Sequence, residues 1–402
     1  MSTRARDLAD VVADALPHIE GAVARGLMQT TIRARDGKRV TLDDGRVVTE
    51  FINCSYLGLD RHPRVVSAAK SVLDEWGVHF CCARSRFTIG PNTDLEARLS
   101  THFRGHAITF PSVTSAHMST LPLLASGVLL PARRHARVRM IFDRFAHASM
   151  QSLKPILAED ARVTSIGHND LTALARELDE AERADEDAVF VADSVYSMGG
   201  TCPLDEVRSL ARAKGATLYI DDAHGTSIFG DRGEGYLLSR VAGPLPDDVI
   251  FTFSLAKGFG TNGGGVVVPL DRQRALIRSF GTTAAFSAPL DFAIVAAADA
   301  ALSLHDDGTV RALQQTLVDK VALFDGLRGI AEPMSPIRMV PLTSRDQALD
   351  VGEALVERGF FVTVALYPVV PRERPQLRVC LTVEHRDDDI RGLADALRAL
   401  GV

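Results

Sequence analysis

Short apolar runs alternate with helical stretches through the middle of the chain. The stretches between the runs carry apolar residues at helical spacing, whereas the runs themselves are almost wholly apolar. This alternation is typical of a parallel sheet with helices on both faces. The predicted strands are HAITF, VRMIFD, AVFVADS, ATLYIDDAH and DVIFTFS, and the helices between them include DLTALARELDEAERA and LDEVRSLARAKG.

The two ends of the chain have different patterns. Residues 1–25 have helical spacing, and the segment that follows alternates apolar and polar residues around DG turns, which predicts short strands and a hairpin. A helix is predicted from Arg61. After Pro289 one long helix, about 290–304 and onward through VRALQQTLVDKVALFDGLRG, leads to a smaller α+β segment. Its predicted strands are MVPLT, FVTVAL and LRVCLT, and DDDIRGLADALRAL is its closing helix.

These patterns predict an α/β protein in three parts. Residues 1–50 form an N-terminal helix and short strands, residues 51–289 form a large domain with a mainly parallel sheet, and residues 290–402 form a small C-terminal α+β domain. Ligands of such sheets bind beyond the carboxyl ends of the strands. Residues that bind ligands or take part in catalysis are therefore expected at those ends.

Composition excludes several classes of protein. The chain has 402 residues, 46% hydrophobic and 24% charged, as expected of a globular protein with a sizeable core. Its net charge of -6 disfavours a nucleic-acid partner. The five cysteines form no CxxC pair, which predicts neither a disulfide framework nor a metal site. The longest apolar run, about 118–132, is too short to span a membrane, and the N-terminus lacks a signal core, so we expect a cytoplasmic protein.

Polar residues follow four of the predicted strands. They are Asp143 and His147, Asp193 and Ser197, Asp221 with Asp222 and His224, and Ser254 with Lys257. A lone aspartate after a strand usually caps a helix or turn, and this is the interpretation we favour for Asp222. A functional role is favoured for the other residues, because the carboxyl ends of the strands would place them together in one crevice.

Lys257 lies among small and apolar residues in FTFSLAKGFGTNGGGVVV. It could extend to solvent, and the glycines could simply form a turn that enters a strand. A Walker phosphate loop is excluded because its lysine follows the glycines at a helix start. A desolvated lysine is a nucleophile toward aldehydes. Together with an aspartate that holds a protonated ring nitrogen, it is what pyridoxal phosphate requires.

Seven segments, in order, resemble the α-oxoamine synthases, which are fold-type-I pyridoxal-phosphate enzymes that include 8-amino-7-oxononanoate synthase and serine palmitoyltransferase. The segments are INCSYLGLDRHPRVVSAA, RSRFTIG, FDRFAHASM, VADSVYSMGGTCPL, YIDDAHGTSIFGDRGEGY, SLAKGFGTNGGGVV and LRVCLTVEH. The short sequences SLAK, DSVYS and FAH also resemble those of the family branch that makes long-chain aminoketone autoinducers. The resemblance extends from about Phe51 to the C-terminus and implies the aspartate aminotransferase-like fold.

The resemblance implies roles around the cofactor. Lys257 would form the Schiff base and act as general base, and Asp221 would pair with the ring nitrogen. His147 would stack on the ring and face the acyl carbonyl, while His224 and Ser197 would assist at the phenolic oxygen.

Further residues are implied for the phosphate and the substrates. Ser254 and the turn of Ser112, Val113 and Thr114 would bind the phosphate. Arg378 would grip the amino-acid carboxylate, and Cys54 lies where the family has a substrate-holding asparagine. Arg84 and Arg86 are candidates to meet the phosphates of an acyl carrier.

Several residues depart from the family pattern. Val113 and His117 replace the glycine and asparagine of the phosphate turn, so we expect a different backbone there because valine tolerates positive φ badly. Gly199 replaces an aspartate, Tyr367-Pro368 stands where RP is frequent, and the residues around Phe286 and Ser287 are atypical. These departures favour a specialised biosynthetic substrate over glycine or alanine.

The implied reaction is the decarboxylative condensation of an amino acid with an acyl thioester, carried by coenzyme A or an acyl carrier protein, to give an α-aminoketone. The implied assembly is a homodimer with active sites at its interface. Another pyridoxal-phosphate reaction, by an aldolase, lyase or aminotransferase, is an alternative. A non-catalytic partner subunit is disfavoured because Lys257 is present.

Overall fold

The computed structural model describes residues 8–80 and 82–402, so Cys81 and the first residues of the predicted N-terminal helix lie outside it. The chain forms two compact units. Among the described residues, unit 1 comprises 8–56, 198–200 and 315–402, and unit 2 comprises 57–80, 82–197 and 201–314. The three-part division expected from the sequence stays a prediction.

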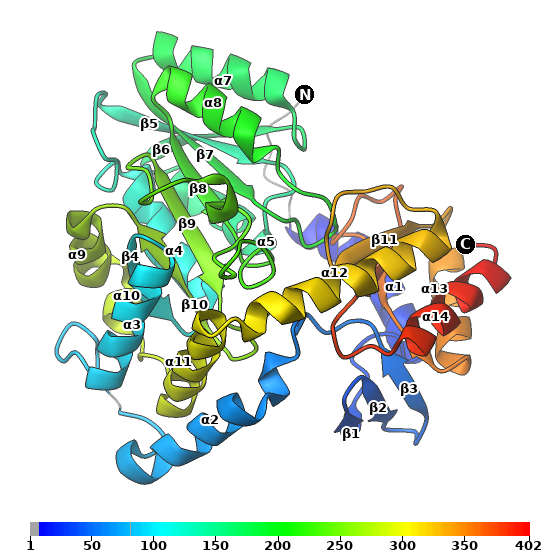
Figure 1. Ribbon diagram of the computed structural model, residues 1–402. Helices are drawn as coiled ribbons and strands as arrows, with labels where there is room; N and C mark the ends of the chain where they lie inside the picture. The colour runs from blue at the N-terminus through cyan, green and yellow to red at the C-terminus, as the bar shows by residue number, and fades with distance from the viewer. Residues whose placement is uncertain (1–7, 81) are drawn as a thin grey trace. The chain divides into compact units, whose positions relative to one another are not determined.

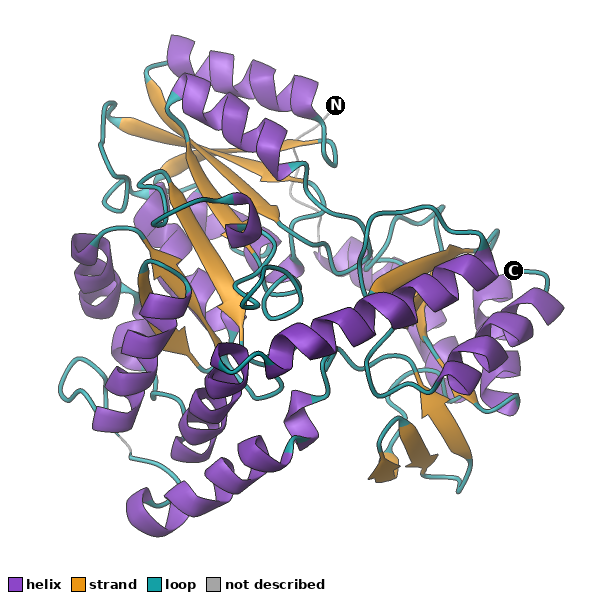
Figure 2. Cartoon of the chain, viewed as in Figure 1, coloured by secondary structure: helices purple, strands orange, loops and turns teal. Residues whose placement is uncertain are grey.

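A seven-stranded sheet forms the centre of unit 2 (Figures 1 and 2). β10 is antiparallel to both of its neighbours, and all other adjacent pairs are parallel, which confirms the predicted mainly parallel sheet. In spatial order the strands are β4 (His106–Phe110), β10 (Gly264–Val268), β9 (Val249–Ser254), β8 (Thr217–Asp221), β7 (Glu186–Asp193), β5 (Arg137–Asp143) and β6 (Ala161–Ile166).

Each of the five predicted runs in this region forms one of these strands. The sequence pattern missed β6 because this strand lies at the sheet edge and is only partly buried along its length. It left β10 undecided because this strand begins with two glycines, which are rare in strand interiors. Those glycines are needed, since a Cβ at Gly265 would lie 2.4 Å from the Ile108 carbonyl oxygen of β4.

Helices cover both faces of the sheet. On one face, α4 (Val113–Ala125) packs Leu121 and Leu124 into a core with Phe110, Phe142 and Val266. On the other side α7 (Leu171–Arg183) and α8 (Leu204–Lys214) lie next to each other over β7 and β8 (Figure 1). The other helices of unit 2 are α2 (Pro63–Trp76), α3 (Gly90–His102), α5 (Ala148–Gln151), α6 (Lys154–Leu157), α9 (Asp271–Phe280), α10 (Thr282–Phe286) and α11 (Phe292–Asp306), with 3-10 turns at Leu59–Arg61 and Leu238–Arg240.

Local sequence sets the ends of these helices. The Asp170 side chain accepts a hydrogen bond from the Ala173 N–H at 2.9 Å and so caps the start of α7. Gly215 ends α8 with a φ of 61°, the left-handed conformation that glycine adopts at low cost. The single long helix predicted after Pro289 is instead two helices, α11 and α12 (Thr309–Arg328). They are separated by Gly308, whose φ of 86° cannot continue a helix.

Unit 1 contains two small sheets. One has the order β1 (Ile32–Asp36), β2 (Arg39–Leu42), β3 (Val47–Glu50) and β12 (Phe360–Phe361), and the other has the order β11 (Ile337–Pro341), β14 (Gln376–Cys380) and β13 (Thr363–Ala365). The predicted N-terminal hairpin and C-terminal strands are therefore confirmed. Helices α1 (Leu8–Ala24), α13 (Arg345–Glu357) and α14 (Asp387–Ala399) complete this unit, and α13 was not predicted.

Across residues 8–80 and 82–402, no helix is long and apolar enough to cross a membrane. Within the same residues no cluster of three or more His, Cys, Asp or Glu side chains could hold a metal ion.

Two buried histidines of unit 2 make its stability depend on pH. Burial is the main cause that lowers the pKa of His102 to about 3 and that of His305 to about 4. The folded chain therefore binds fewer protons than the unfolded chain between about pH 4 and 6.5. The stabilisation from these neutral rings is complete above pH 6.5 and is lost as the pH falls.

We predict that the free energy of unfolding, measured by urea denaturation, falls as the pH is lowered from 6.5 to 4.5. Each ring should contribute up to about 1.4 kcal/mol per pH unit to this fall. His305→Gln should flatten this dependence because glutamine stays neutral, whereas the exposed His79→Gln should not. Circular dichroism measures both. An unchanged slope in His305→Gln would refute the assignment.

Candidate active site

Lys257 lies on the turn that follows β9, at the carboxyl edge of the sheet of unit 2. Backbone bonds fix this turn: the Gly260 N–H donates to the Lys257 carbonyl at 2.9 Å, and the Leu255 N–H donates to Gly263 at 3.0 Å. The turn packs tightly, since a Cβ at Gly258 would lie 2.7 Å from the Thr226 carbonyl oxygen. The lysine side chain is half-buried and so accessible from the site.

Asp221 is a buried carboxylate at the end of β8. It lies 3.1 Å from His117 Nε2 and accepts the Ala223 N–H at 3.0 Å. The other ring nitrogen of His117 lies 2.9 Å from the Tyr219 hydroxyl, so the ring is held on both sides while Nε2 donates to Asp221. Hydrogen bonding and charge from His117, followed by the charge of Lys257, outweigh burial and hold the pKa of Asp221 below its ordinary value. Asp221 is therefore ionised.

His147 begins α5, and its main-chain N–H donates to Asp193 Oδ1 at 2.8 Å. Its Nδ1 lies 2.7 Å from Ser149 Oγ, which orients the ring. Burial is the main cause that lowers the pKa of His147, while the charge of Asp221 opposes this and that of Lys257 adds to it. Lys257, Asp221 and His147 are thus near enough to influence one another's protonation.

Two more carboxyl groups flank Asp221, and their protonation differs from its own. Asp193 is paired with Asp221 across β7 and β8, and burial, followed by the charge of Asp221, raises its pKa well above the ordinary value. Asp222 is fully buried, accepts hydrogen bonds from Ser194 and from the Leu237 N–H, and has a pKa raised by burial to about 7. These contacts support the interpretation of Asp222 as a residue that holds the loop.

The predicted phosphate turn is the N-terminus of α4. The Ser112 side chain caps this helix by accepting the Ser115 N–H at 3.0 Å, so the N–H groups of Val113 and Thr114 are those of a first helical turn, which has no acceptor of its own. Val113 is the first residue of α4 and has no positive φ, so the valine meets no backbone strain there, and the expected difference from the family's turn stays a prediction. Its side chain has room because Gly264 lies opposite, where a Cβ would be 2.6 Å from Val113 Cγ2.

Ser254 ends β9, and Gly264 pairs with both Ser254 and Phe110, so this part of the edge adjoins the start of α4. The Ser254 hydroxyl oxygen accepts the Ala256 N–H at 3.1 Å. Ser197 follows β7 and is half-buried, and His224 follows β8 and is buried. Their roles at a cofactor stay predictions.

Two predicted substrate-binding residues belong to unit 1, where they contact each other. Arg378 on β14 donates from Nη2 to Cys54 Sγ at 3.4 Å. In unit 2, Arg86 is exposed, as a residue that meets a carrier would be. Arg84 does not reach toward a carrier, because its guanidinium forms an ion pair with the buried Glu96 at 2.5 Å.

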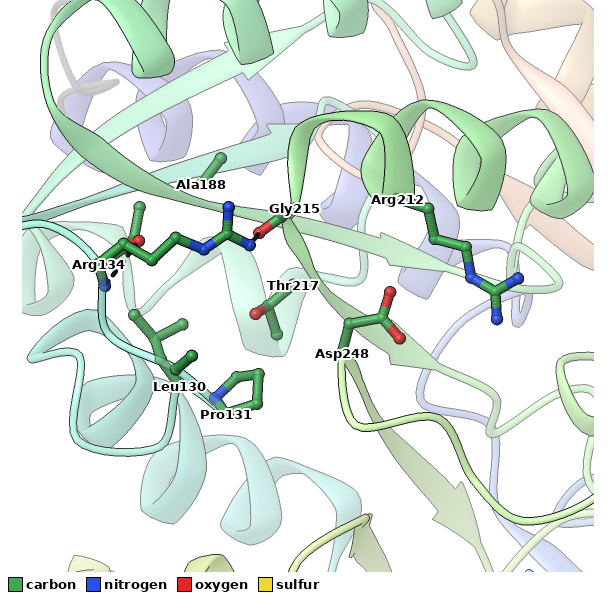
Figure 3. Close-up of a pocket in the computed structure, with 10 residues that line it drawn as sticks. Leu130, Pro131, Arg134, Ala188, Arg212, Gly215, Thr217 and Asp248 are labelled. Atoms are coloured by element: carbon green, nitrogen blue, oxygen red, sulfur yellow. Dashed lines mark hydrogen bonds between the residues drawn. The ribbon is translucent and has the colours of Figure 1, made fainter.

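A cavity of about 200 Å³ lies at the opposite edge of the sheet, near the starts of β7 and β8 (Figure 3). Arg134 extends across it and donates to the Gly215 carbonyl at 2.9 Å, and the Asp187 carboxylate accepts the Arg134 N–H at 3.1 Å. These charged groups are engaged in holding loops together. The cavity therefore does not mark the site formed by Lys257 and Asp221.

Unit 2 thus brings together Lys257, Asp221 and His147 at one edge of the sheet, as the sequence predicted. It adds His117, which the sequence showed only as a departure from a family pattern. His117 lies on α4, five positions after the Ser112 cap, and its partner Asp221 lies 104 positions away in the chain, so no local pattern identifies the pair.

An amine, a buried ionised carboxylate and an imidazole at the carboxyl ends of a sheet with this topology define a fold-type-I pyridoxal-phosphate enzyme. Residues 59–397 match the family model described as aminotransferase class I and II. The chain belongs to this family and, within it, to the α-oxoamine synthases.

Three known proteins illustrate the similarity. The 8-amino-7-oxononanoate synthase of Maricaulis maris is 30% identical, over 95% of this chain and 94% of its own. That of Mycobacterium sp. (strain JLS) is 34% identical, over 88% and 91%. Among solved structures, Sphingomonas wittichii serine palmitoyltransferase is 25% identical and superposes with a TM-score of 0.85, over 98% of this chain and 99% of that one.

The residues present fit pyridoxal phosphate. The ionised Asp221 would accept a hydrogen bond from a protonated ring nitrogen, and the half-buried Lys257 supplies an amine for the aldehyde. The N–H groups of Val113 and Thr114 in the first turn of α4 suit a phosphate. A suitable group is therefore present for the ring nitrogen, the aldehyde and the phosphate.

We predict that His117→Phe weakens pyridoxal phosphate binding by roughly tenfold to a hundredfold, because a charge-assisted hydrogen bond to a buried carboxylate contributes about 1.5–3 kcal/mol. Tyr219→Phe, which removes only the outer hydrogen bond, should have a smaller effect. Titration of the apoprotein followed by absorbance gives both affinities, and the melting temperature of each apoprotein controls for folding. Equal affinities in His117→Phe and the parent would contradict this role.

Proposed function

We propose that this protein condenses an amino acid with an acyl thioester, releasing carbon dioxide and the free thiol and forming an α-aminoketone. The observation that supports this most is the grouping of Lys257, Asp221 and His147 in a chain 30% identical to an 8-amino-7-oxononanoate synthase over 95% of its length. It would be a pyridoxal-phosphate-dependent C-acyltransferase.

Proton transfer falls to Lys257 in this proposal. Bound pyridoxal phosphate would withdraw electrons from the α-carbon of the amino acid. The Lys257 amine would hold the aldehyde before the substrate arrives and afterwards remove the α-proton as general base. The ionised Asp221 would keep the ring nitrogen protonated, and His117 would keep Asp221 ionised.

His147 would bind near the reacting carbonyl. Its depressed pKa, caused mainly by burial, keeps it neutral at pH 7, so one ring nitrogen is available to donate a hydrogen bond to the acyl oxygen. The Arg378 guanidinium would hold the amino-acid carboxylate, a planar match of two donors to two acceptors. Since Cys54 Sγ already accepts from Arg378, a carboxylate there would compete with the thiol.

The substrates would be those of a specialised pathway, and either coenzyme A or an acyl carrier protein would present the acyl group. Exposed Arg86 is a candidate contact for the carrier. A cytoplasmic location is part of this proposal, as the cysteine pattern of the sequence suggests.

The reaction is tested by incubating the holoenzyme with a panel of amino acids, with and without acyl-CoA and acyl carrier thioesters, followed by mass spectrometry. We expect an aminoketone and carbon dioxide only when a thioester is present, and neither with Lys257→Ala. A keto acid formed without thioester would indicate an aminotransferase, and a cleaved amino acid would indicate a lyase. A purified protein that pyridoxal phosphate cannot colour would indicate a non-catalytic subunit.

We also propose a homodimer, formed through an aromatic surface of unit 2. Phe87, Phe280 and Phe286 are 64%, 67% and 85% exposed, which is unusual for large apolar side chains. Beside them a cavity of about 30 Å³ is lined by Phe87, Arg278 and Ala284 among others. Asn92 is buried in its wall, and neither polar atom of its side chain has a partner among the described residues. A second copy would cover the phenylalanines and supply such a partner.

We predict that Phe286→Glu converts the dimer to a monomer, measured by size-exclusion chromatography with light scattering. Ile156→Glu is the matched control, since Ile156 on α6 is 53% exposed and lies outside the aromatic surface. It should remain dimeric. A monomeric parent protein, or a dimeric Phe286→Glu variant, would overturn this proposal.

A further inference from the structure

Unit 1 brings two cysteines and an arginine together. Cys54 Sγ accepts a hydrogen bond from Arg378 Nη2 at 3.4 Å. Arg378 and Cys380 are two positions apart on β14, so their side chains point to the same face of that strand. The Cys380 thiol is near enough to Cys54 to hydrogen-bond to it. The two thiol groups and the guanidinium therefore form one cluster.

The backbone holds this arrangement in place. The Cys380 N–H donates to the Phe51 carbonyl at 2.7 Å, and the Val383 N–H donates to the Tyr56 carbonyl at 2.9 Å. Within the loop between these points, the Ser55 N–H donates to Asn53 Oδ1 at 2.6 Å. The segment that carries Cys54 is thus fixed on both sides against the end of β14.

The two thiols differ in charge. The pKa of Cys54 lies well below its ordinary value, chiefly because the Cys380 thiol hydrogen-bonds to it and then because of the Arg378 charge, both acting against burial. The pKa of Cys380 lies well above its ordinary value, with the same hydrogen bond and burial as causes. Cys54 is therefore the more readily ionised of the two and Cys380 the less readily ionised, which is the division of roles between an attacking and a resolving cysteine.

Access to solvent follows the same division. Cys54 is partly exposed, whereas Cys380 is buried behind it. Cys202 provides a contrast, since it is buried and its pKa is raised by burial, which makes it an inert thiol. Cys82 is partly exposed like Cys54, and it serves below as the exposure-matched control.

We propose that Cys54 and Cys380 form an oxidant-sensitive thiol pair that a hydroperoxide converts into a disulfide. The Cys54 thiolate attacks the outer oxygen of the peroxide, the O–O bond breaks, and Cys54 becomes a sulfenic acid while the other oxygen leaves as water or alcohol. The Cys380 sulfur then attacks the sulfenic sulfur, its proton and the hydroxyl leave as water, and the S–S bond forms. Two electrons pass from the thiols to the peroxide.

The proposal is independent of the reaction that the protein catalyses, because its readouts are the states of the sulfur atoms. Oxidation removes the anion next to Arg378. The charge around this guanidinium would therefore change with the redox state of the pair.

Peptide mapping of the holoenzyme tests the pair. The reduced protein is treated with a small excess of hydrogen peroxide, and free thiols are then blocked with N-ethylmaleimide. We expect a peptide linked through Cys54 and Cys380 that dithiothreitol reverses. Cys380→Ser should leave Cys54 as a sulfenic acid that dimedone labels, Cys54→Ser should leave Cys380 reduced, and Cys82→Ser should leave the link intact. Oxidation of other cysteines with no such link would overturn the proposal.

Alkylation kinetics test the contribution of the arginine. The rate at which iodoacetamide modifies Cys54 is measured against pH by mass spectrometry in the parent protein and in Arg378→Met. The variant should react about tenfold more slowly at pH 7, with its midpoint shifted upward by roughly one unit or more, because the thiolate loses its cationic partner. Circular dichroism confirms that the variant is folded, and the Cys82 rate should not change. Equal Cys54 profiles in the two proteins would contradict the pairing.

Discussion

The buried negative charge of Asp221 is the constraint on which the rest of the site depends. A carboxylate out of water is costly unless hydrogen bonds and opposite charge surround it. In this chain His117 and the Ala223 N–H provide the hydrogen bonds, and the charge of Lys257 reinforces them. If Asp221 were neutral, it would not hold a protonated ring nitrogen. The cofactor that Lys257 needs for its chemistry would then be bound less well.

Two neighbouring carboxyl groups, Asp193 and Asp222, differ from Asp221 in their protonation. Asp143 ends β5 and accepts hydrogen bonds from the Phe145 and Asn169 N–H groups, so it holds the loops around it. Asp193 and Asp222 have raised pKa values because burial dominates their surroundings. Adjacent strand ends thus carry the same residue type with different protonation, and the partners brought by the fold decide which one is charged.

The sequence predicted the parts of the structure that depend on local pattern. Buried runs became strands, and Lys257, Asp221 and His147 lie at strand ends because the carboxyl ends of parallel strands share an edge. His117 was missed because its meaning depends on Asp221, 104 residues away in the chain, which only the packing of α4 on the sheet brings near. The role of Arg84 was missed for a similar reason, since its partner Glu96 becomes buried only when α3 packs. The break at Gly308 was missed because a glycine within a helical pattern does not reveal its φ.

Locating the residue that carries the cofactor tests the pairing of Lys257 and Asp221 most directly. The purified holoenzyme is reduced with borohydride, digested and mapped by mass spectrometry. We expect a pyridoxyl phosphate group on the peptide that contains Lys257, with loss of the visible absorption band. Stable attachment to any other lysine, with Lys257 unmodified, would contradict the assignment of the amine and with it the pairing of Lys257 and Asp221 around one ring.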